Sequence, residues 1–127
     1  MAAYDATWFD PPAPLARVCL RNPTSGAEWS DAPPLIDSGA DVTLVPQAAL
    51  NRLGVPAIAD RQYELVGFDG TTTFAPIVRL DLVFCRRTFR GQFLVIDQEW
   101  GVLGGNVLNA VPLLLDGPRL AWDEHRP

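Results

Sequence analysis

The stretch PPLIDSGADVTLVP, residues 33–46, contains a carboxylate in a position where it could act as a general acid or base. Asp37 follows the apolar pair Leu35 and Ile36, which predicts the end of a buried strand. A carboxylate is costly to bury there unless something uses it. Small residues at 38–40 keep its oxygens open to a ligand and let another backbone approach closely. Taken alone, the pattern also fits an ordinary Asx turn after a strand.

Other catalytic chemistries find little support in the sequence. The single histidine, His125, lies in the C-terminal tail, and Cys19 and Cys85 are far apart without CxxC spacing. These residues predict neither a zinc cluster nor Cys–His or Ser–His catalysis. The stretch GVLGGN at 101–106 has neither GxGxxG nor a P-loop lysine, so no nucleotide loop is indicated. We therefore expect no metal and no cofactor.

The composition is that of a globular chain with an acidic surface. The 127 residues carry a formal net charge of −5, and the sequence pI is about 4.6. This charge disfavours nucleic acid and anionic membrane as partners. No apolar run approaches the roughly 18 residues of a membrane span. The N-terminus lacks the basic and apolar regions of a secretory signal, and we expect a cytoplasmic protein.

The elements that would position Asp37 follow from periodicity and turn residues. Alternating residues predict a strand at 15–21, and a second extended segment over 27–37 is interrupted by two prolines. Residues 45–54 predict a short helix with a proline near its first turn and a glycine at its end. Residues 63–84 predict two strands around Asp69-Gly70, a type I′ hairpin signal.

The rest of the chain continues with short elements and frequent turns. In order, we expect a turn at 85–91, a buried strand at 92–96, a glycine-rich approach to a short helix at 101–111, a hairpin at 112–122 and a frayed tail at 123–127. Together these elements predict an all-β barrel or sandwich with one or two short helices.

Three segments, in order along the chain, resemble the retropepsin-like aspartic proteases, the single-domain family of the retroviral proteases and their cellular and bacterial relatives. LIDSGADVTLVP (35–46), VGFDGTTTF (66–74) and VLGGNVL (102–108) stand where that family has its catalytic loop, its flap and its glycine turn with C-terminal helix. The resemblance implies a small closed barrel of retropepsin-like type. It makes 1–127 a single domain with an N-terminal extension at 1–14.

The resemblance also implies roles for the residues of the first segment. Asp37 would be the catalytic residue, followed by the active-site loop of Ser38, Gly39, Ala40 and Asp41. Ser38 would take part in a hydrogen-bonded grip between two such loops. The backbone of Gly39 and the side chain of Asp41 would line the main chain of the substrate.

The other two segments would complete the site. The flap would be formed by Gly67, Phe68, Asp69 and Gly70, and the glycine turn by Val102, Leu103 and Gly104. The flap would fold over a peptide bound in extended form, like an added strand. The terminal strand at 119–122 would join a sheet shared by two copies.

Peptide hydrolysis by carboxylates requires two of them around one water. One is ionised and acts as general base, while the other is protonated and polarises the substrate carbonyl. Two carboxylates held close together share a proton and titrate as a coupled pair. The chain has no second Asp-Ser/Thr-Gly, and Asp69-Gly70 and Asp116-Gly117 lie at expected hairpin tips. The second carboxylate must therefore come from Asp37 of another copy in a two-fold homodimer.

One position departs from the family pattern. The glycine turn in this family often continues with Arg followed by Asp or Asn, whereas here Gly105 precedes Asn106. The arginine typically pairs with the residue matching Asp41, so we expect Asp41 to be exposed or to find another donor. This departure leaves two alternatives open, a catalytically idle binding module that could be monomeric, and a structural β-domain in which Asp37 merely caps a turn.

Overall fold

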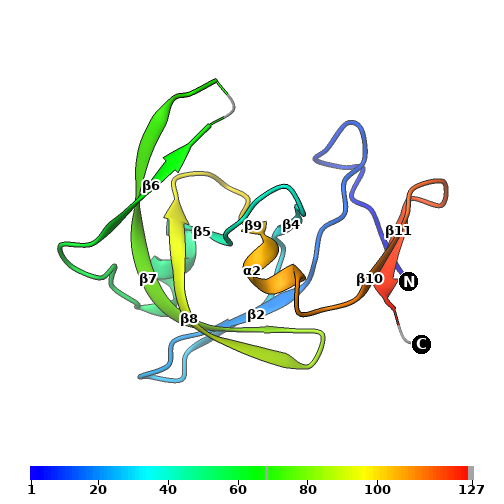
Figure 1. The fold of residues 1–127 in the computed structure, drawn as a ribbon. Coiled ribbons are helices and arrows are strands. Elements are labelled where there is room, and N and C mark those ends of the chain that lie inside the picture. The colour runs from blue at the N-terminus through cyan, green and yellow to red at the C-terminus, as the bar shows by residue number, and fades with distance from the viewer. Residues whose placement is uncertain (68, 126–127) are drawn as a thin grey trace.

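A computed structural model describes residues 1–67 and 69–125, which we call the described residues. Within them the chain is mostly β, with two short helices (Figure 1). The strands are β1 (Ala2–Ala3), β2 (Val18–Arg21), β3 (Glu28–Ala32), β4 (Leu35–Ile36), β5 (Leu44–Pro46), β6 (Gln62–Val66), β7 (Thr72–Phe84), β8 (Arg87–Ile96), β9 (Val102–Leu103), β10 (Leu113–Asp116) and β11 (Ala121–Glu124). The helices are α1 (Gln47–Leu53) and α2 (Gly105–Leu108). No helix in this part of the chain is long and apolar enough to cross a membrane.

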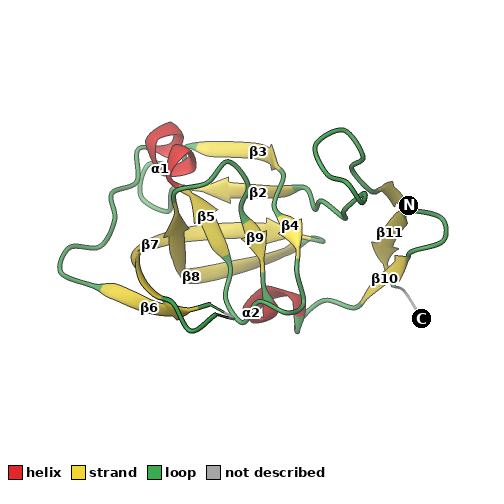
Figure 2. Cartoon of the chain, turned by 90° about the horizontal axis from the view of Figure 1, so that it is seen from above, coloured by secondary structure: helices red, strands yellow, loops and turns green. Residues whose placement is uncertain are grey.

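The larger sheet has the strand order β3-β2-β7-β8-β5-β9-β4, with β6 paired to the first half of β7. β7 and β8 form its long antiparallel pair, whereas β5 runs parallel to β8 and β4 parallel to β9. An isolated bridge between Leu15 and Leu35 joins β4 to the segment that leads into β2, so the sheet curls back on itself (Figure 2). The predicted all-β fold with two short helices is confirmed.

The turn between β7 and β8 is shorter than the sequence predicts. The predicted turn covers 85–91, but only Cys85 and Arg86 lie between the two strands. Both have positive φ angles, 51° and 63°. Two consecutive residues with positive φ form a type I′ turn, for which Asn and Gly are preferred. Because neither Asn nor Gly occurs at positions 85 and 86, the sequence does not indicate this turn. Residues 87–91 instead belong to β8, which also contains the predicted strand 92–96.

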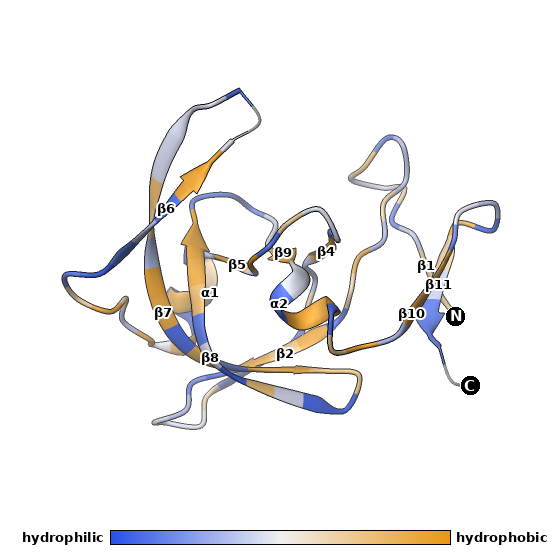
Figure 3. Cartoon of the chain, viewed as in Figure 1, coloured by the Kyte–Doolittle hydropathy of each residue, from blue (hydrophilic) through white to orange (hydrophobic). Residues whose placement is uncertain are grey.

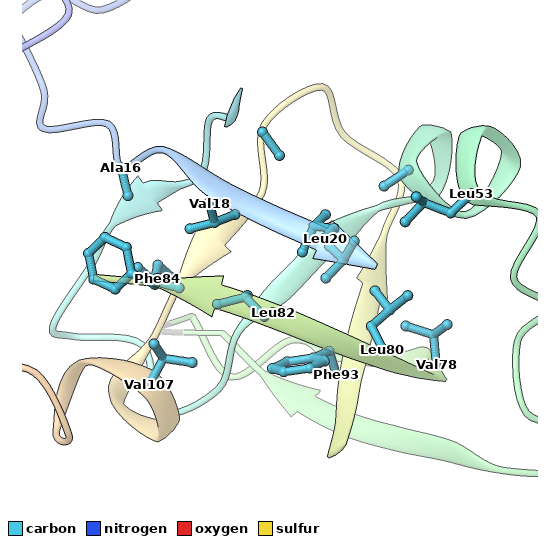
Figure 4. Close-up of a cluster of buried hydrophobic side chains, with 14 of the residues drawn as sticks. Ala16, Val18, Leu20, Leu53, Val78, Leu80, Leu82, Phe84, Phe93 and Val107 are labelled. Atoms are coloured by element: carbon cyan, nitrogen blue, oxygen red, sulfur yellow. The ribbon is translucent and has the colours of Figure 1, made fainter. Parts of the chain in front are cut away.

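The core lies inside the curled sheet. Alternate side chains of β2, β7 and β8 point into it and meet residues of α1 and α2 (Figure 4). Val78 and Leu80 are 0% exposed and Leu82 is 1% exposed. Each such leucine contributes about 1.5–3 kcal/mol by leaving water. Figure 3 shows the apolar residues concentrated along these strands, with polar residues at the turns.

Helix α1 confirms the helix predicted at 45–54. Pro46 precedes it in extended conformation, and Gly54 ends it with a left-handed φ of 66°, which glycine adopts without strain. Ala49, Leu50 and Leu53 share the buried face. The helix is therefore held in place by an apolar stripe rather than by side-chain capping.

The two ends of the chain form a smaller sheet of their own. Its order is β1-β11-β10, so β11 lies between the N-terminal strand and β10 (Figure 2). Trp122 anchors β11, since its ring packs on Phe84 and its Nε1 donates to the Leu15 carbonyl at 3.0 Å. The predicted frayed tail at 123–127 is wrong for Asp123 and Glu124, which pair within β11. Residues 126–127 lie outside the described residues.

Candidate active site

The loop that carries Asp37 begins where β4 ends. The Asp37 N–H donates to the Leu103 carbonyl of β9 at 3.1 Å, which continues the parallel pairing by one residue. The loop then turns sharply, because the Ala40 N–H donates to the Asp37 carbonyl at 3.2 Å. The Gly39 N–H donates to Asp37 Oδ1 at 2.9 Å. This last bond fixes the orientation of the carboxylate relative to the backbone of its own loop.

Asp37 is exposed in the single chain, as are Ser38 and Gly39. One copy by itself therefore does not bear the cost of burying this carboxylate. The physical reason is local, since the strand ends at Ile36 and the tight turn carries the next residue out of the sheet. Among the described residues, only the Gly39 N–H donates to this carboxylate. A free carboxylate edge on a rigid loop is accessible to water and to a ligand.

The glycine turn grips this loop through main-chain groups. The Gly105 N–H donates to the Ala40 carbonyl at 2.7 Å, and the Asn106 N–H donates to the Asp41 carbonyl at 3.1 Å. A Cβ atom on Gly104 would lie 2.2 Å from the Val42 carbonyl oxygen, so only glycine fits there. Val102 and Leu103 form β9. Because β9 pairs with β4, the glycine turn that follows β9 lies beside the loop that follows β4.

Two polar residues that sequence reasoning missed lock the turn and the loop together. Thr43 is 2% exposed, and its Oγ1 donates to Asn106 Oδ1 at 2.7 Å while accepting the Gly104 N–H at 3.1 Å. Both functions of the buried hydroxyl are thus satisfied, as burial requires. In the sequence, the one sign of these contacts is a single threonine directly before the apolar strand that follows the candidate loop.

Asp41 is exposed, which confirms one of the two outcomes expected for a chain without the arginine. No ion pair involving Asp41 is found among the described residues. A Cβ atom on Gly105 would lie 3.4 Å from the Ala40 carbonyl and 3.7 Å from the Asp41 carbonyl, both ordinary contacts. The backbone around position 105 therefore leaves room for a Cβ atom, and glycine is not required there for steric reasons.

The hairpin of β6 and β7 contains the segment 66–74, for which the family resemblance implies a flap. The tip of this hairpin and the loop between β4 and β5 lie on the same side of the molecule, at the top of Figure 1. Its tip covers 67–71 and is not the predicted two-residue turn, because the Gly67 N–H donates to the Thr71 carbonyl and the Gly70 N–H to the Gly67 carbonyl. Gly70 adopts a φ of 82°, which requires glycine in this turn. Phe68 lies outside the described residues.

Asp69 organises the tip of this hairpin. Its Oδ1 accepts the Thr71 N–H at 2.9 Å, and this bond lowers the pKa of the Asp69 carboxyl below its ordinary value. The carboxyl is fully exposed, so the tip presents a negative charge to the solvent.

A second, smaller apolar cluster includes residues of this hairpin and residues that follow the loop of Asp37. Its buried members are Ala75, Ile77 and Leu94, and its half-buried members are Val42, Leu44, Ile58 and Leu65. A groove of about 150 Å³ opens beside it, next to Tyr63 and Asn106. Because the cluster is only partly covered, it offers apolar surface beside the loop of Asp37.

No group of three or more His, Cys, Asp and Glu side chains placed to hold a metal occurs in residues 1–67 and 69–125. Cys85 is half-buried at the β7–β8 turn, and desolvation raises the pKa of its thiol. The thiolate needed for nucleophilic chemistry is therefore disfavoured there.

Comparison with solved structures places this geometry in a known fold. The protease of EIAV, solved in complex with the inhibitor HBY-793, superposes with a TM-score of 0.59 over 86% of this chain and 93% of that chain. The fold is retropepsin-like. The two sequences are 20% identical, so the likeness concerns the fold. No model of a known protein family matches the sequence, and neither does a curated protein.

Proposed function

We propose that this protein is an aspartic endopeptidase that acts as a homodimer, with Asp37 of two copies forming one catalytic pair. The observation that carries the proposal is the exposed Asp37 carboxylate, which accepts the Gly39 N–H on a loop that main-chain bonds join to Leu103 and to the glycine turn. The retropepsin-like fold around it supports the proposal. A single carboxylate accounts for only half of the chemistry, so the second copy is part of the site.

In this mechanism the two carboxyl groups share one proton and hold one water between them. The ionised carboxylate takes a proton from the water, whose oxygen then attacks the peptide carbonyl carbon. The protonated carboxyl donates its proton to the carbonyl oxygen, which gives a neutral tetrahedral diol. As the carbon–nitrogen bond breaks, the leaving nitrogen takes up a proton from the pair and a diol hydroxyl returns one.

The surrounding residues would bind the substrate in extended form. Gly39 would offer its backbone and Asp41 its side chain to the substrate main chain, while Ser38 would join the two loops. The hairpin tip, with Gly67, Phe68, Asp69 and Gly70, would close over the peptide. Ala40 and the glycine turn of Val102, Leu103 and Gly104 would keep the loop in place through the bonds described above.

A second candidate function rests on the glycine at position 105. Without an arginine there, Asp41 is exposed and unpaired among the described residues, and the loop lacks one contact expected near the dimer centre. The same fold could then serve as a monomeric, non-catalytic module that binds peptides or partner strands. Sedimentation at micromolar concentration discriminates between the two functions, since a monomer at all accessible concentrations would favour the non-catalytic module.

Peptide-library cleavage between pH 3 and 8 tests the proposal, with wild type compared with Asp37→Asn. We expect cleavage by wild type with an acid limb that reflects a coupled pair, and no cleavage by the variant. Asp60→Asn is the matched control, because Asp60 is an exposed aspartate with a φ of 60°, a conformation that asparagine tolerates. Full activity of the folded Asp37→Asn variant would overturn the proposal.

A further inference from the structure

Three aromatic side chains from distant segments of the chain meet at one place on the surface. Trp8 and Phe9 lie in the N-terminal loop, 5–13, and Trp100 lies in the β8–β9 link, 97–101. The centre of the Phe9 ring is 5.3 Å from that of Trp100, and the centre of the Trp8 ring is 6.4 Å from it. We call these three side chains the aromatic cluster.

The two segments that carry the aromatic cluster flank β4, the strand that leads to Asp37. On one side of β4, the Ile36 N–H donates to the Pro14 carbonyl at 3.0 Å, directly after the N-terminal loop. On the other side, the Leu35 N–H donates to the Gly101 carbonyl of the β8–β9 link at 2.9 Å. The N-terminal loop (dark blue) and the β8–β9 link lie in the upper part of Figure 1, as does the loop of Asp37. The aromatic cluster is therefore on the side of the molecule where a peptide bound at Asp37 would lie.

Trp8 is the open member of the aromatic cluster. It is 66% exposed, whereas Phe9 and Trp100 are half-buried. Its backbone is held in place, because the Trp8 N–H donates to Asp5 Oδ2 at 2.9 Å. The Trp8 and Trp100 rings meet at an angle of 52°, a tilted contact that leaves much of the Trp8 indole open to a ligand. Large aromatic rings of this kind supply contact area at binding surfaces for a small loss of side-chain entropy.

The charge around the aromatic cluster is negative. The N-terminal loop and the β8–β9 link contain no arginine or lysine and four carboxylates, Asp5, Asp10, Asp97 and Glu99. None of these carboxylates takes part in an ion pair within residues 1–67 and 69–125. The face of an aromatic ring is also electron-rich. A cation is therefore attracted by the ring faces and by the carboxylates, and an anion is repelled by both.

We propose that the aromatic cluster binds a cationic side chain, arginine or lysine, of the peptide that Asp37 would cleave, and that Trp8 is the residue that selects it. Arginine fits best, because its planar guanidinium stacks on an indole face while its N–H groups are free to bond a carboxylate. The same pairing occurs within the chain, where the Arg52 guanidinium lies 4.8 Å from the centre of the Trp29 ring.

The inference rests on the proposed function in taking a peptide as the ligand, but it makes a separate claim about the side chain that is selected. All three rings belong to one chain, so the binding surface is complete in a single copy. Binding can therefore be measured whether or not two copies associate and whether or not the peptide is cleaved.

The binding experiment uses the chain with Asp37→Asn, so that no probe is consumed. The probes are short peptides of alternating alanine and serine in which one position in turn carries arginine, its uncharged isostere citrulline, or glutamate. In NMR, we expect the arginine peptides to shift the indole N–H signal of Trp8. At the position with the largest shift, arginine should bind about two- to fivefold more tightly than citrulline, and glutamate should bind most weakly.

Substitutions at two positions separate the ring from the charge. Trp8→Leu should abolish the preference for arginine over citrulline, whereas Trp8→Phe should retain part of it, because phenylalanine also presents a ring face. Asp10→Asn should weaken the preference and make it less sensitive to salt. Asp60→Asn is the matched control, since Asp60 is an exposed aspartate outside both segments, and it should leave the preference unchanged. Circular dichroism and thermal unfolding show whether each variant keeps its fold.

Several outcomes would overturn the inference. These are a Trp8 signal that no peptide shifts, citrulline or glutamate peptides that bind as tightly as arginine peptides, and a folded Trp8→Leu variant that still prefers arginine. Cleavage of a peptide library by wild type is measured separately. Arginine-selective binding at Trp8 without any cleavage overturns the proposed function alone, and cleavage that is indifferent to arginine and to Trp8 overturns this inference alone.

Discussion

Gly105→Arg would place a cation beside Asp41 and thereby test why this loop lacks its ion pair. The position accepts a side chain, because a Cβ atom on Gly105 would contact the Ala40 and Asp41 carbonyl oxygens at 3.4 and 3.7 Å. Asp41 is exposed. It lies beside this position in space, because the Asn106 N–H donates to the Asp41 carbonyl. An arginine side chain is long enough to span this gap.

The expected gain in the free energy of unfolding combines two effects. Replacing glycine inside a helix removes a penalty of about 0.5–1 kcal/mol, because the unfolded chain has less freedom to lose. An exposed ion pair adds about 0.2–1 kcal/mol. A cation at a helix N-terminus subtracts about 0.3 kcal/mol or more, although α2 is a single turn and this effect is small. The sum is about 1 kcal/mol, which corresponds to roughly 4 °C in the unfolding temperature of a chain of this size.

Thermal unfolding followed by circular dichroism measures this gain, and Gly105→Ala isolates the helix contribution. Combining each substitution with Asp41→Asn closes a double-mutant cycle that reports the ion pair alone. The coupling should shrink as salt is raised, because exposed charges are screened. Sedimentation of the same proteins shows whether the ion pair also strengthens dimerisation.

Two results would refute this reasoning. Gly105→Arg less stable than wild type, beside a well-tolerated Gly105→Ala, would show that the space around the turn is not available to a long side chain. A coupling of zero between positions 41 and 105 would show that an arginine at position 105 does not form an ion pair with Asp41.

Three further predictions concern the loop and the hairpin. Gly104→Ala should lower the free energy of unfolding by several kcal/mol, about 3 in urea denaturation, because its Cβ would overlap the Val42 carbonyl. Thr43→Val should cost about 1–3 kcal/mol in the same measurement, since it leaves the buried Gly104 N–H unpaired and removes the bond to Asn106. In NMR, the Thr71 amide should titrate with a midpoint below the ordinary pKa of aspartate, because its bond to ionised Asp69 is present above that midpoint and lost as the pH falls through it.

Each of these predictions has its own control. Gly117→Ala matches the first, because a Cβ atom there meets nothing within 4 Å, and equal losses at both glycines would contradict the overlap argument. Thr72→Val, at an exposed position, matches the second and should change stability little. Asp69→Asn should abolish the third titration, and a Thr71 amide that still titrates in that variant would show that another group is responsible.

Much of the candidate site could be predicted because its signals are local. The turn after Ile36 is closed by the bond from the Ala40 N–H to the Asp37 carbonyl, and proline and glycine bracket α1. The order of loop, hairpin and glycine turn along the chain then predicts the fold. Short-range chemistry of this kind is readable in one sequence.

The errors arose where distant segments decide the outcome. β11 extends to Glu124 because Asp123 and Glu124 pair with Leu114 and Leu113 of β10. β1, more than a hundred residues earlier in the chain, pairs with Ala121 and Trp122 of the same strand, and no local pattern reveals that pairing. The turn at Cys85 and Arg86 adopts positive φ angles against local preference, since the long β7–β8 pairing on either side enforces it.

The contacts between the glycine turn and the loop of Asp37 are made mostly by main-chain groups, and this has a consequence for evolution and for engineering. Peptide N–H and carbonyl groups are the same in every residue, so the bonds from Gly105 and Asn106 to the loop survive most changes of side chain. Residues that line the groove beside the second apolar cluster, such as Val42, can therefore change during evolution while the backbone and the position of Asp37 are kept. Similarity of sequence would decay long before similarity of shape, and a library varied at these positions should yield mostly folded proteins.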